Sequence, residues 1–244
     1  MTTYFISGAS SGLGAEMARR LVRRGDAVAI SARRHDLLEA LAAELSAKGG
    51  LVTVHPADVR DLDQVRRAIL EADERHGGLD VVVANAGRGG GGRIGTGRWR
   101  ENREVIETNL LGTLNQAEVA MELFRRREGG HLVLVSSLAS VRGLPGSAAV
   151  YSASKAAVTT LGESLRIQTK GSGVRVTTLL PGYVKTELSS RARFPYLSPL
   201  GRGVEAMIEA IDTGRGEVVV PALPWRPLGW MLRAVPEALI RRFM

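Results

Sequence analysis

The stretch Y-F-I-S-G-A-S-S-G-L-G, residues 4–14, combines an apolar strand, a glycine-rich turn and the start of a helix. Its glycines are Gly8, Gly12 and Gly14, and a helical pattern continues from Gly12 to about Gly25. Glycine allows a tight turn and a close approach of the backbone to a ligand. The N-terminus of a helix attracts phosphate through unpaired N–H groups and its positive dipole end. The stretch therefore predicts a strand–turn–helix unit that binds a pyrophosphate; a purely structural turn is the alternative.

Apolar runs and helical periodicity alternate over the rest of the chain. We expect further strands within residues 27–32, 51–58, 79–87, 131–137, 174–182 and 217–221, and helices within 36–45, 63–77, 101–127 and 151–171. The alternation predicts an α/β fold of Rossmann type, which is a doubly wound parallel sheet of about seven strands flanked by helices. Because no linker is evident, residues 1–244 should form a single domain.

The composition narrows the possible functions. The 244 residues are 44% hydrophobic, enough for the core of one full-sized domain. The absence of cysteine excludes disulfides and thiolate chemistry, and the four scattered histidines lack metal-ligand spacing. The formal charge of +8 comes mainly from arginines dispersed over helix faces, which favours solvated faces and an anionic cofactor over nucleic acid. No secretory signal and no run of ~18 apolar residues is present, so a cytoplasmic protein is expected.

The choice of cofactor is indicated by S-A-R-R-H-D, residues 31–36. A fold that prefers NAD places an acid about 20 residues past the glycine-rich turn, where it holds the ribose 2′-hydroxyl. This chain has Arg33 and Arg34 there, and a guanidinium pairs with a 2′-phosphate that a carboxylate would repel. We therefore predict NADP(H), with Arg33 as the main contact. Two surface arginines at a helix start are the alternative, and Asp36 is assigned to the first turn of that helix.

A second motif, Y-S-A-S-K at residues 151–155, places a phenol and an ammonium four residues apart. Positions i and i+4 of a helix share a face, so Tyr151 and Lys155 can point into one pocket. A nearby ammonium favours phenolate and should lower the pKa of Tyr151 toward neutral pH, which makes the phenol usable as a general acid/base. Taken alone the spacing is often coincidental, so its weight depends on the surrounding motifs.

The surrounding motifs follow one order: G-x-x-x-G-x-G at 8–14, A-D-V at 57–59, A-N-A-G at 84–87, E-T-N-L-L-G-T at 107–113, V-S-S at 135–137, Y-x-x-x-K, and P-G-Y-V-K-T at 181–186. In this order they resemble the compact, single-domain branch of the short-chain dehydrogenase/reductase family over roughly residues 3–190. Two departures from the family pattern are present. Ala84 replaces an Asn, and the spacing from Ser137 to Tyr151 is one residue longer than is common, so Ser136 and Ser140 stay as alternatives to Ser137.

The resemblance implies a catalytic tetrad of Asn109, Ser137, Tyr151 and Lys155. Ser137 would hold the substrate oxygen, Tyr151 would transfer the proton, and Lys155 would tune Tyr151 and bind the cofactor ribose. Asn109 would hold a water that links Lys155 to solvent; an ordinary helix Asn is the alternative. Beside Tyr151 and Lys155, the expected cofactor contacts are Gly8, Ser10, Ser11, Gly12, Leu13, Gly14, Arg33, Arg34, Asp58, Val59, Asn85, Ala86, Gly87, Pro181, Gly182, Val184 and Thr186.

The resemblance thins toward the C-terminus. Residues 221–244 form an extension rich in apolar residues and arginine, which Pro227 and Pro236 should break into short helices. The extension is predicted to pack on the chain's own core or on another subunit; a cap over an apolar substrate pocket and a membrane-interface contact are the alternatives. A substrate lid is expected within residues 185–203. The glycine-rich loop 87–98 is either a mobile part of the site or a surface loop.

Together these features predict an NADP(H)-dependent oxidoreductase that interconverts a carbonyl and a secondary alcohol by hydride transfer. The substrate would be a small molecule, and the enzyme a homodimer or homotetramer. The alternative is a catalytically silent NADP(H)-sensing regulatory protein, since a fold alone does not prove activity. The complete tetrad favours the enzyme.

Overall fold

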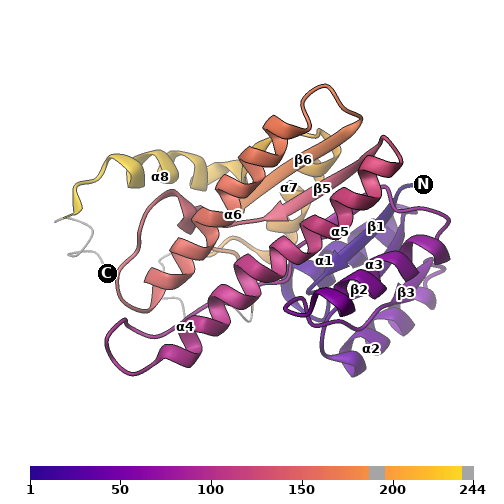
Figure 1. Ribbon diagram of the computed structural model, residues 1–244, viewed down its shortest axis with the longest axis horizontal. Coiled ribbons are helices and arrows are strands. Elements are labelled where there is room, and N and C mark those ends of the chain that lie inside the picture. The colour runs from indigo at the N-terminus through magenta and orange to yellow at the C-terminus, as the bar shows by residue number, and fades with distance from the viewer. Residues whose placement is uncertain (187–195, 238–244) are drawn as a thin grey trace.

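The computed structural model describes residues 1–186 and 196–237 and alternates strands with helices (Figure 1). The first elements are β1 (Thr3–Ser7), α1 (Gly12–Arg23), β2 (Ala27–Ser31), α2 (His35–Ser46), β3 (Val52–Val54), α3 (Leu62–Arg75), β4 (Val81–Ala84), α4 (Trp99–Ile106) and η1 (Glu107–Leu111). They are followed by α5 (Gly112–Arg126), β5 (Gly130–Val135), η2 (Leu138–Val141), η3 (Gly146–Ala148), α6 (Ala149–Gln168), β6 (Val174–Pro181), α7 (Leu200–Asp212), β7 (Glu217–Val220) and α8 (Ala222–Ala234).

Seven strands form one sheet in the order β3-β2-β1-β4-β5-β6-β7, and every pairing is parallel. β1 lies between β2 and β4, so that Ile6 pairs with Ile30 on one side and Val83 on the other. Strands β2 and β3 extend the sheet on one side of β1, and strands β4 to β7 then extend it on the other side. This reversal puts a topological switch point at the carboxyl ends of β1 and β4, where such sheets bind ligands. The predicted doubly wound parallel sheet is confirmed.

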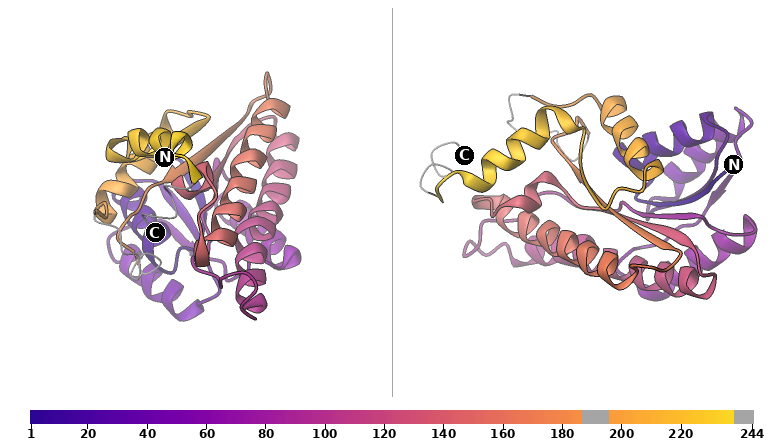
Figure 2. Two further views of the ribbon diagram at one scale, coloured as in Figure 1. Left: turned by 90° about the vertical axis from the view of Figure 1, so that its left-hand side faces the viewer. Right: turned by 90° about the horizontal axis from the view of Figure 1, so that it is seen from above.

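Helices cover both faces of the sheet (Figures 1 and 2). Successive side chains of a strand point to opposite faces and so enter two separate cores. In β1, Tyr4 and Ile6 pack with α1, α2 and α7, whereas Phe5 packs with α3, α5 and α6. Strands buried on both faces need apolar residues at every position, which is why β4 is Val-Val-Val-Ala.

Two helical regions differ from the expectation. The single helix expected over residues 101–127 consists of α4, the π-helical turn η1 and α5, and the N–H of Gly112 donates to the carbonyl of Glu107. Helix α7 is not among the predicted helices, and only its first residues, 200–203, fall in the segment assigned to a lid; residues 187–195 of that segment lie outside the part that the structure describes. The two glycines near its start, Gly201 and Gly203, weaken the helical signal of α7.

Helix α8 continues through Pro227, which was expected to break it. The backbone is non-helical at Leu223, so the regular helix begins after that residue and Pro227 falls in its first turn. A missing N–H disrupts least at that end of a helix. Pro236 follows the end of α8 at Ala234. Across residues 1–186 and 196–237, the helices are all too short or too polar to span a bilayer.

Two buried histidines give the fold a dependence on pH. His55 and His131 are only 2% and 1% exposed, and burial lowers the pKa of each side chain from 6.5 to about 4. His131 also shares a hydrogen bond of 2.9 Å with Thr177 Oγ1. Both imidazoles are neutral in the folded chain at neutral pH. Because the unfolded chain takes up these protons at a higher pH than the folded chain, acid favours unfolding.

We expect the contribution of these histidines to stability to be complete above about pH 7 and to be lost as the pH falls from about 6.5 toward 4, by about 2 kcal/mol per histidine at pH 5. Urea denaturation at neutral pH and at about pH 5 measures the change in the free energy of unfolding. The variant His131→Gln cannot be protonated, so it should lose less stability between the two pH values than the wild type. An equal loss in both proteins would contradict this origin of the pH dependence.

Candidate active site

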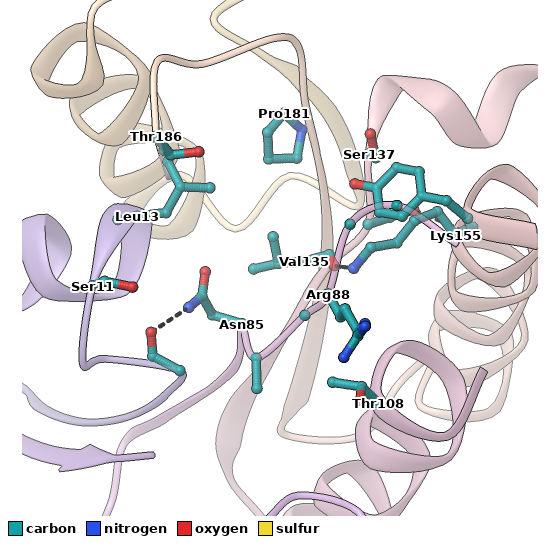
Figure 3. Close-up of a pocket in the computed structure, with 18 of the residues that line it drawn as sticks. Ser11, Leu13, Asn85, Arg88, Thr108, Val135, Ser137, Lys155, Pro181 and Thr186 are labelled. Carbon is teal, nitrogen blue, oxygen red and sulfur yellow. Dashed lines mark hydrogen bonds between the residues drawn. The ribbon is translucent and has the colours of Figure 1, made fainter. Parts of the chain in front are cut away.

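A cavity of about 850 Å³ lies at the carboxyl ends of β1, β4, β5 and β6 (Figure 3). All residues that the sequence assigns to catalysis or cofactor binding line this cavity, except Gly14 and Asn109. Motifs far apart in the chain therefore meet at one edge of the sheet. In the parts of the chain that the structure covers, no three His, Asp or Glu side chains are grouped to hold a metal ion.

The turn after β1 depends on glycine at points of close approach. Gly8 and Gly12 have φ angles of 64° and 57°, in the left-handed region that side chains disfavour. A Cβ on Gly8 would lie 2.8 Å from Cα of Ala86, and a Cβ on Gly14 would lie 2.6 Å from the carbonyl oxygen of Gly8. Gly14 therefore acts behind the cavity, where it lets the first turn of α1 pack against the loop.

Ser7 joins the end of β1 to the end of β4, a role that the sequence does not reveal. Its buried hydroxyl accepts hydrogen bonds from the backbone N–H groups of Asn85 (3.0 Å) and Ala86 (2.9 Å). The side-chain amide of Asn85 donates to the carbonyl oxygen of Ser7 (2.8 Å). These bonds fix the cavity wall between the two strands, and Figure 3 shows Asn85 beside the glycine-rich turn.

The two arginines after β2 reach the cavity in different ways. Arg34 donates to Ser10 Oγ through Nε (3.1 Å) and Nη2 (3.0 Å), and to Ser11 Oγ through Nη2 (2.7 Å). Arg33 Nη1 lies 4.0 Å from a carboxylate oxygen of Asp58. Positive charge and hydroxyl groups therefore gather at this end of the cavity, a combination that suits a phosphate.

Ser137, Tyr151 and Lys155 meet at the carboxyl end of β5. Helix α6 carries Tyr151 and Lys155 one turn apart, and both line the cavity. The Ser137 hydroxyl lies close enough to the Tyr151 side chain to lower the pKa of the phenol. The ammonium of Lys155 donates to the carbonyl oxygen of Val135 (2.8 Å), and burial lowers the pKa of Lys155 to about 8. Figure 3 shows Ser137 and Lys155 on the same wall of the cavity.

The pKa of Tyr151 departs from the expectation. Burial raises the pKa of this phenol, the Ser137 hydroxyl lowers it by less, and the nearby Tyr183 raises it again. The ammonium of Lys155, which was expected to lower the pKa, is directed at the Val135 carbonyl instead. Tyr151 is therefore protonated at neutral pH and is prepared to donate a proton.

Three serines follow β5 closely enough to be candidates for the substrate contact. Ser136 is buried, and its hydroxyl donates to the backbone oxygen of Lys155 (2.8 Å), so it fixes α6 to the strand. Ser140 does not line the cavity. Ser136 and Ser137 both line the cavity, but the Ser136 hydroxyl is engaged with α6 whereas Ser137 acts on Tyr151, so the geometry favours Ser137 for this contact.

Asn109 lies behind the cavity wall, in the π-helical turn. Its side chain accepts from the backbone N–H of Arg88 (2.7 Å) and donates to the Arg88 carbonyl (2.9 Å) and to Ser154 Oγ (3.0 Å). It thus holds the loop after β4 against α6, where a Cβ on Gly87 would lie 3.4 Å from Nζ of Lys155. The water that Asn109 would hold for Lys155 stays a prediction.

The glycine-rich loop 87–98 divides into two parts. Gly89 and Gly90 line the cavity, and the N–H of Gly92 donates to Asn102 Oδ1 (2.8 Å), which ties the loop to α4. Residues 93–98 are exposed. The first part of the loop is therefore a wall of the site, and the second part is surface.

The C-terminal extension packs on its own domain through Trp225. This residue is fully buried, its Nε1 donates to Ser198 Oγ (2.8 Å), and its ring centroid lies 5.7 Å from that of Tyr183. A Cβ on Gly182 would collide with the indole, so the packing of Trp225 requires a glycine there. Tyr183 and Leu138 line the cavity although the sequence does not single them out.

Comparisons with known proteins identify similar sequences and similar folds. A model of the short chain dehydrogenase family matches residues 2–195. An uncharacterized oxidoreductase of Mycobacterium tuberculosis is 43% identical over 241 residues, which cover 98% of this chain and 95% of that protein. A short chain dehydrogenase/reductase from Burkholderia phymatum, in complex with NAD, has a TM-score of 0.86 at 22% identity, covering 98% and 94% of the two chains. An alcohol dehydrogenase from Thermococcus sibiricus, complexed with 5-hydroxy-NADP, has a TM-score of 0.80 at 28% identity, covering 97% and 99%.

Replacing Gly14 by alanine tests the packing of the turn. The new Cβ would lie 2.6 Å from the Gly8 carbonyl oxygen, so either the loop or α1 must shift. We expect a loss of about 1–3 kcal/mol in the free energy of unfolding, measured by urea denaturation. The matched control is Gly143→Ala, where the new Cβ meets nothing within 4 Å. Equal stabilities for the two variants would refute the role given to Gly14.

Proposed function

The chain belongs to the short chain dehydrogenase family of oxidoreductases, and from this premise we propose that it uses NADP(H) to interconvert a carbonyl group and a secondary alcohol. The observation that carries the proposal is the meeting of the Ser137 hydroxyl, the Tyr151 hydroxyl and the Lys155 ammonium on one wall of the cavity. A small-molecule substrate, a homodimer or homotetramer and a cytoplasmic location are part of the same proposal.

The residues present fit a phosphorylated dinucleotide. Ser11, Gly12 and Leu13 line the cavity at the N-terminus of α1, which offers N–H groups and a positive dipole end to a pyrophosphate. Arg33 and Arg34 would hold the 2′-phosphate. The nicotinamide end would contact the opposite walls: Asn85, Ala86, Gly87, Pro181, Gly182, Val184 and Thr186. A bound nicotinamide supplies the hydride for reduction or accepts it in oxidation.

The protein's own contribution to the reaction is the handling of the proton. In reduction, Tyr151 donates its proton to the substrate oxygen while the Ser137 hydroxyl hydrogen-bonds the same oxygen. The raised pKa keeps Tyr151 in the protonated form that this step needs. Lys155 lies one helical turn away, and its positive charge would stabilise the phenolate that remains after the transfer. In oxidation the phenolate takes the proton from the alcohol.

The preference for NADP(H) rests on the arginines of this chain. The solved relatives do not decide it, because one is in complex with NAD and the other with 5-hydroxy-NADP. Arg34 is anchored on two serine hydroxyls at the cavity, and Arg33 faces Asp58. Asp36 lies in the first turn of α2, as expected. Two guanidiniums at this end favour a 2′-phosphate over a 2′-hydroxyl.

Replacing Arg33 and Arg34 together by alanine tests the choice of cofactor. We expect NADPH to bind about 10- to 100-fold more weakly and NADH to bind almost as before, because only NADPH carries the 2′-phosphate. Isothermal titration calorimetry measures both affinities without a known substrate. The double variant Arg67→Ala/Arg75→Ala removes the same charge from exposed positions of α3 and is the control. Similar losses for both cofactors, or in the control, would contradict a specific phosphate contact.

Replacing Tyr151 by phenylalanine tests the proton transfer. We expect turnover of NADPH with a panel of ketones and aldehydes, followed by absorbance, to fall about 10²- to 10⁴-fold. NADPH affinity should change much less, because Tyr151 is only one of many expected cofactor contacts whereas its hydroxyl is the proton donor to the substrate oxygen. The control is Tyr196→Phe, since Tyr196 is 39% exposed and does not line the cavity. Tight NADPH binding by a wild type that reduces no member of the panel would favour the sensing protein instead.

A further inference from the structure

The inner face of α8 fixes this helix beside the cavity. Trp225 is fully buried, and a Cβ on Gly229 would lie 2.9 Å from Cδ1 of Leu138, which lines the cavity. The guanidinium of Arg142 donates through Nη1 to the carbonyl oxygens of Leu232 (3.1 Å) and Arg233 (3.2 Å) near the end of the helix. Both ends of α8 are therefore held against the domain, where the helix contacts η2. The helix extends from the body of the domain toward the left of Figure 1 (see also Figure 2).

The outer face of α8 is apolar and exposed. Pro227, Trp230, Met231 and Ala234 follow the i, i+3, i+4, i+7 spacing of one helix face, and all are exposed. Trp230 is 64% exposed and Met231 55%, and Leu223, at the kink before the regular helix, is 64% exposed. Large apolar side chains scattered singly on a surface need no explanation, but three within nine residues form a patch. This patch contributes nothing to the two cores of the domain.

The charges carried by α8 itself are all positive. Arg226 stacks over the ring of Trp230, with its guanidinium carbon 5.3 Å from the ring centroid. Arg233 follows Arg226 by two turns and is also exposed. Residues 218–236 contain no Asp or Glu, and the exposed Glu237 follows after the end of α8. The face therefore combines an aromatic ring, apolar side chains and arginines, and α8 itself contributes no acid to pair with them.

We propose that the outer face of α8 docks on an anionic lipid surface. Tryptophan with arginine beside it suits the boundary between headgroups and acyl chains, where the indole enters and the guanidiniums meet lipid phosphates. A second copy of the chain fits this face poorly. A two-fold contact through α8 would bring the arginines of the two helices together with no acid on the face to neutralise them. Because the inner face contacts Leu138, a bilayer bound at the outer face would adjoin the cavity.

The test is co-sedimentation of the full-length protein with vesicles of phosphatidylcholine alone and of phosphatidylcholine mixed with phosphatidylglycerol. We expect binding to the mixed vesicles at low salt, weaker binding at high salt, and little binding to the neutral vesicles. Trp230→Gln should lower the partition constant by about tenfold. Arg226→Gln/Arg233→Gln should lower it by about as much on mixed vesicles only.

Matched controls separate this face from the general surface. Trp99→Gln removes a tryptophan that is 70% exposed at the start of α4, and Arg67→Gln/Arg75→Gln removes two charges from α3; neither should change vesicle binding. NADPH affinity and thermal unfolding report that each variant is folded. Absence of binding to either vesicle, equal binding to both, or equal effects of the controls would overturn the proposal. The proposal would also be overturned if the protein bound no vesicles but self-associated, and if Trp230→Gln abolished that self-association. That result would assign the outer face of α8 to a second copy of the chain.

Discussion

The close contact between the turn after β1 and the end of β4 is the constraint on which the rest of the structure depends. Side chains cannot be accommodated there, because a Cβ on Gly8 would enter the backbone of Ala86 and a Cβ on Gly14 would enter that of Gly8. The buried hydroxyl of Ser7 then ties the two strand ends together through two N–H groups. The contact brings the N-terminus of α1 against the wall formed by Asn85. Because this contact is so short, the proposed phosphate-binding turn after β1 and the proposed nicotinamide-binding segment after β4 can face the same cavity.

Burial acts in opposite directions on the two groups that would move the proton. Removal from water disfavours charge, so it raises the pKa of Tyr151 and lowers that of Lys155 to about 8. With a pKa of about 8 the lysine nevertheless keeps most of its charge at neutral pH, and its ammonium donates to the Val135 carbonyl. The tyrosine stays protonated, because the Ser137 hydroxyl lowers its pKa by less than burial raises it. The tyrosine is thus kept as a proton donor beside a lysine whose charge favours the anion that donation leaves behind.

Local patterns predicted the features that a few neighbouring residues determine, and missed those that arise from packing. The alternating strands, the glycine-rich turn and the pairing of Tyr151 with Lys155 on one helix face are local. The lowered pKa expected for Tyr151 was wrong in direction, because spacing along a helix reports neighbouring charge and not burial. Ser7 looks like any turn serine, and the requirement for glycine at 182 comes from Trp225, more than forty residues later. Helix α7 did carry a signal, with Val204, Met207 and Ile211 on its buried face.

Trp225 and Trp230 lie on opposite sides of helix α8, and only the first of them contributes to the stability of the domain. Trp225 is fully buried and hydrogen-bonded to Ser198, so its removal would open a cavity in the domain. Trp230 lies five residues later on the other side of the helix and contacts water instead of a core. Folding gains little from an exposed indole, and solubility is reduced by it. The stability of the domain therefore accounts for the inner face of α8 but not for the outer face. The outer face carries the Trp230 ring, an apolar stripe and two arginines without an acid on the helix, which is the composition of a surface that binds something outside the chain.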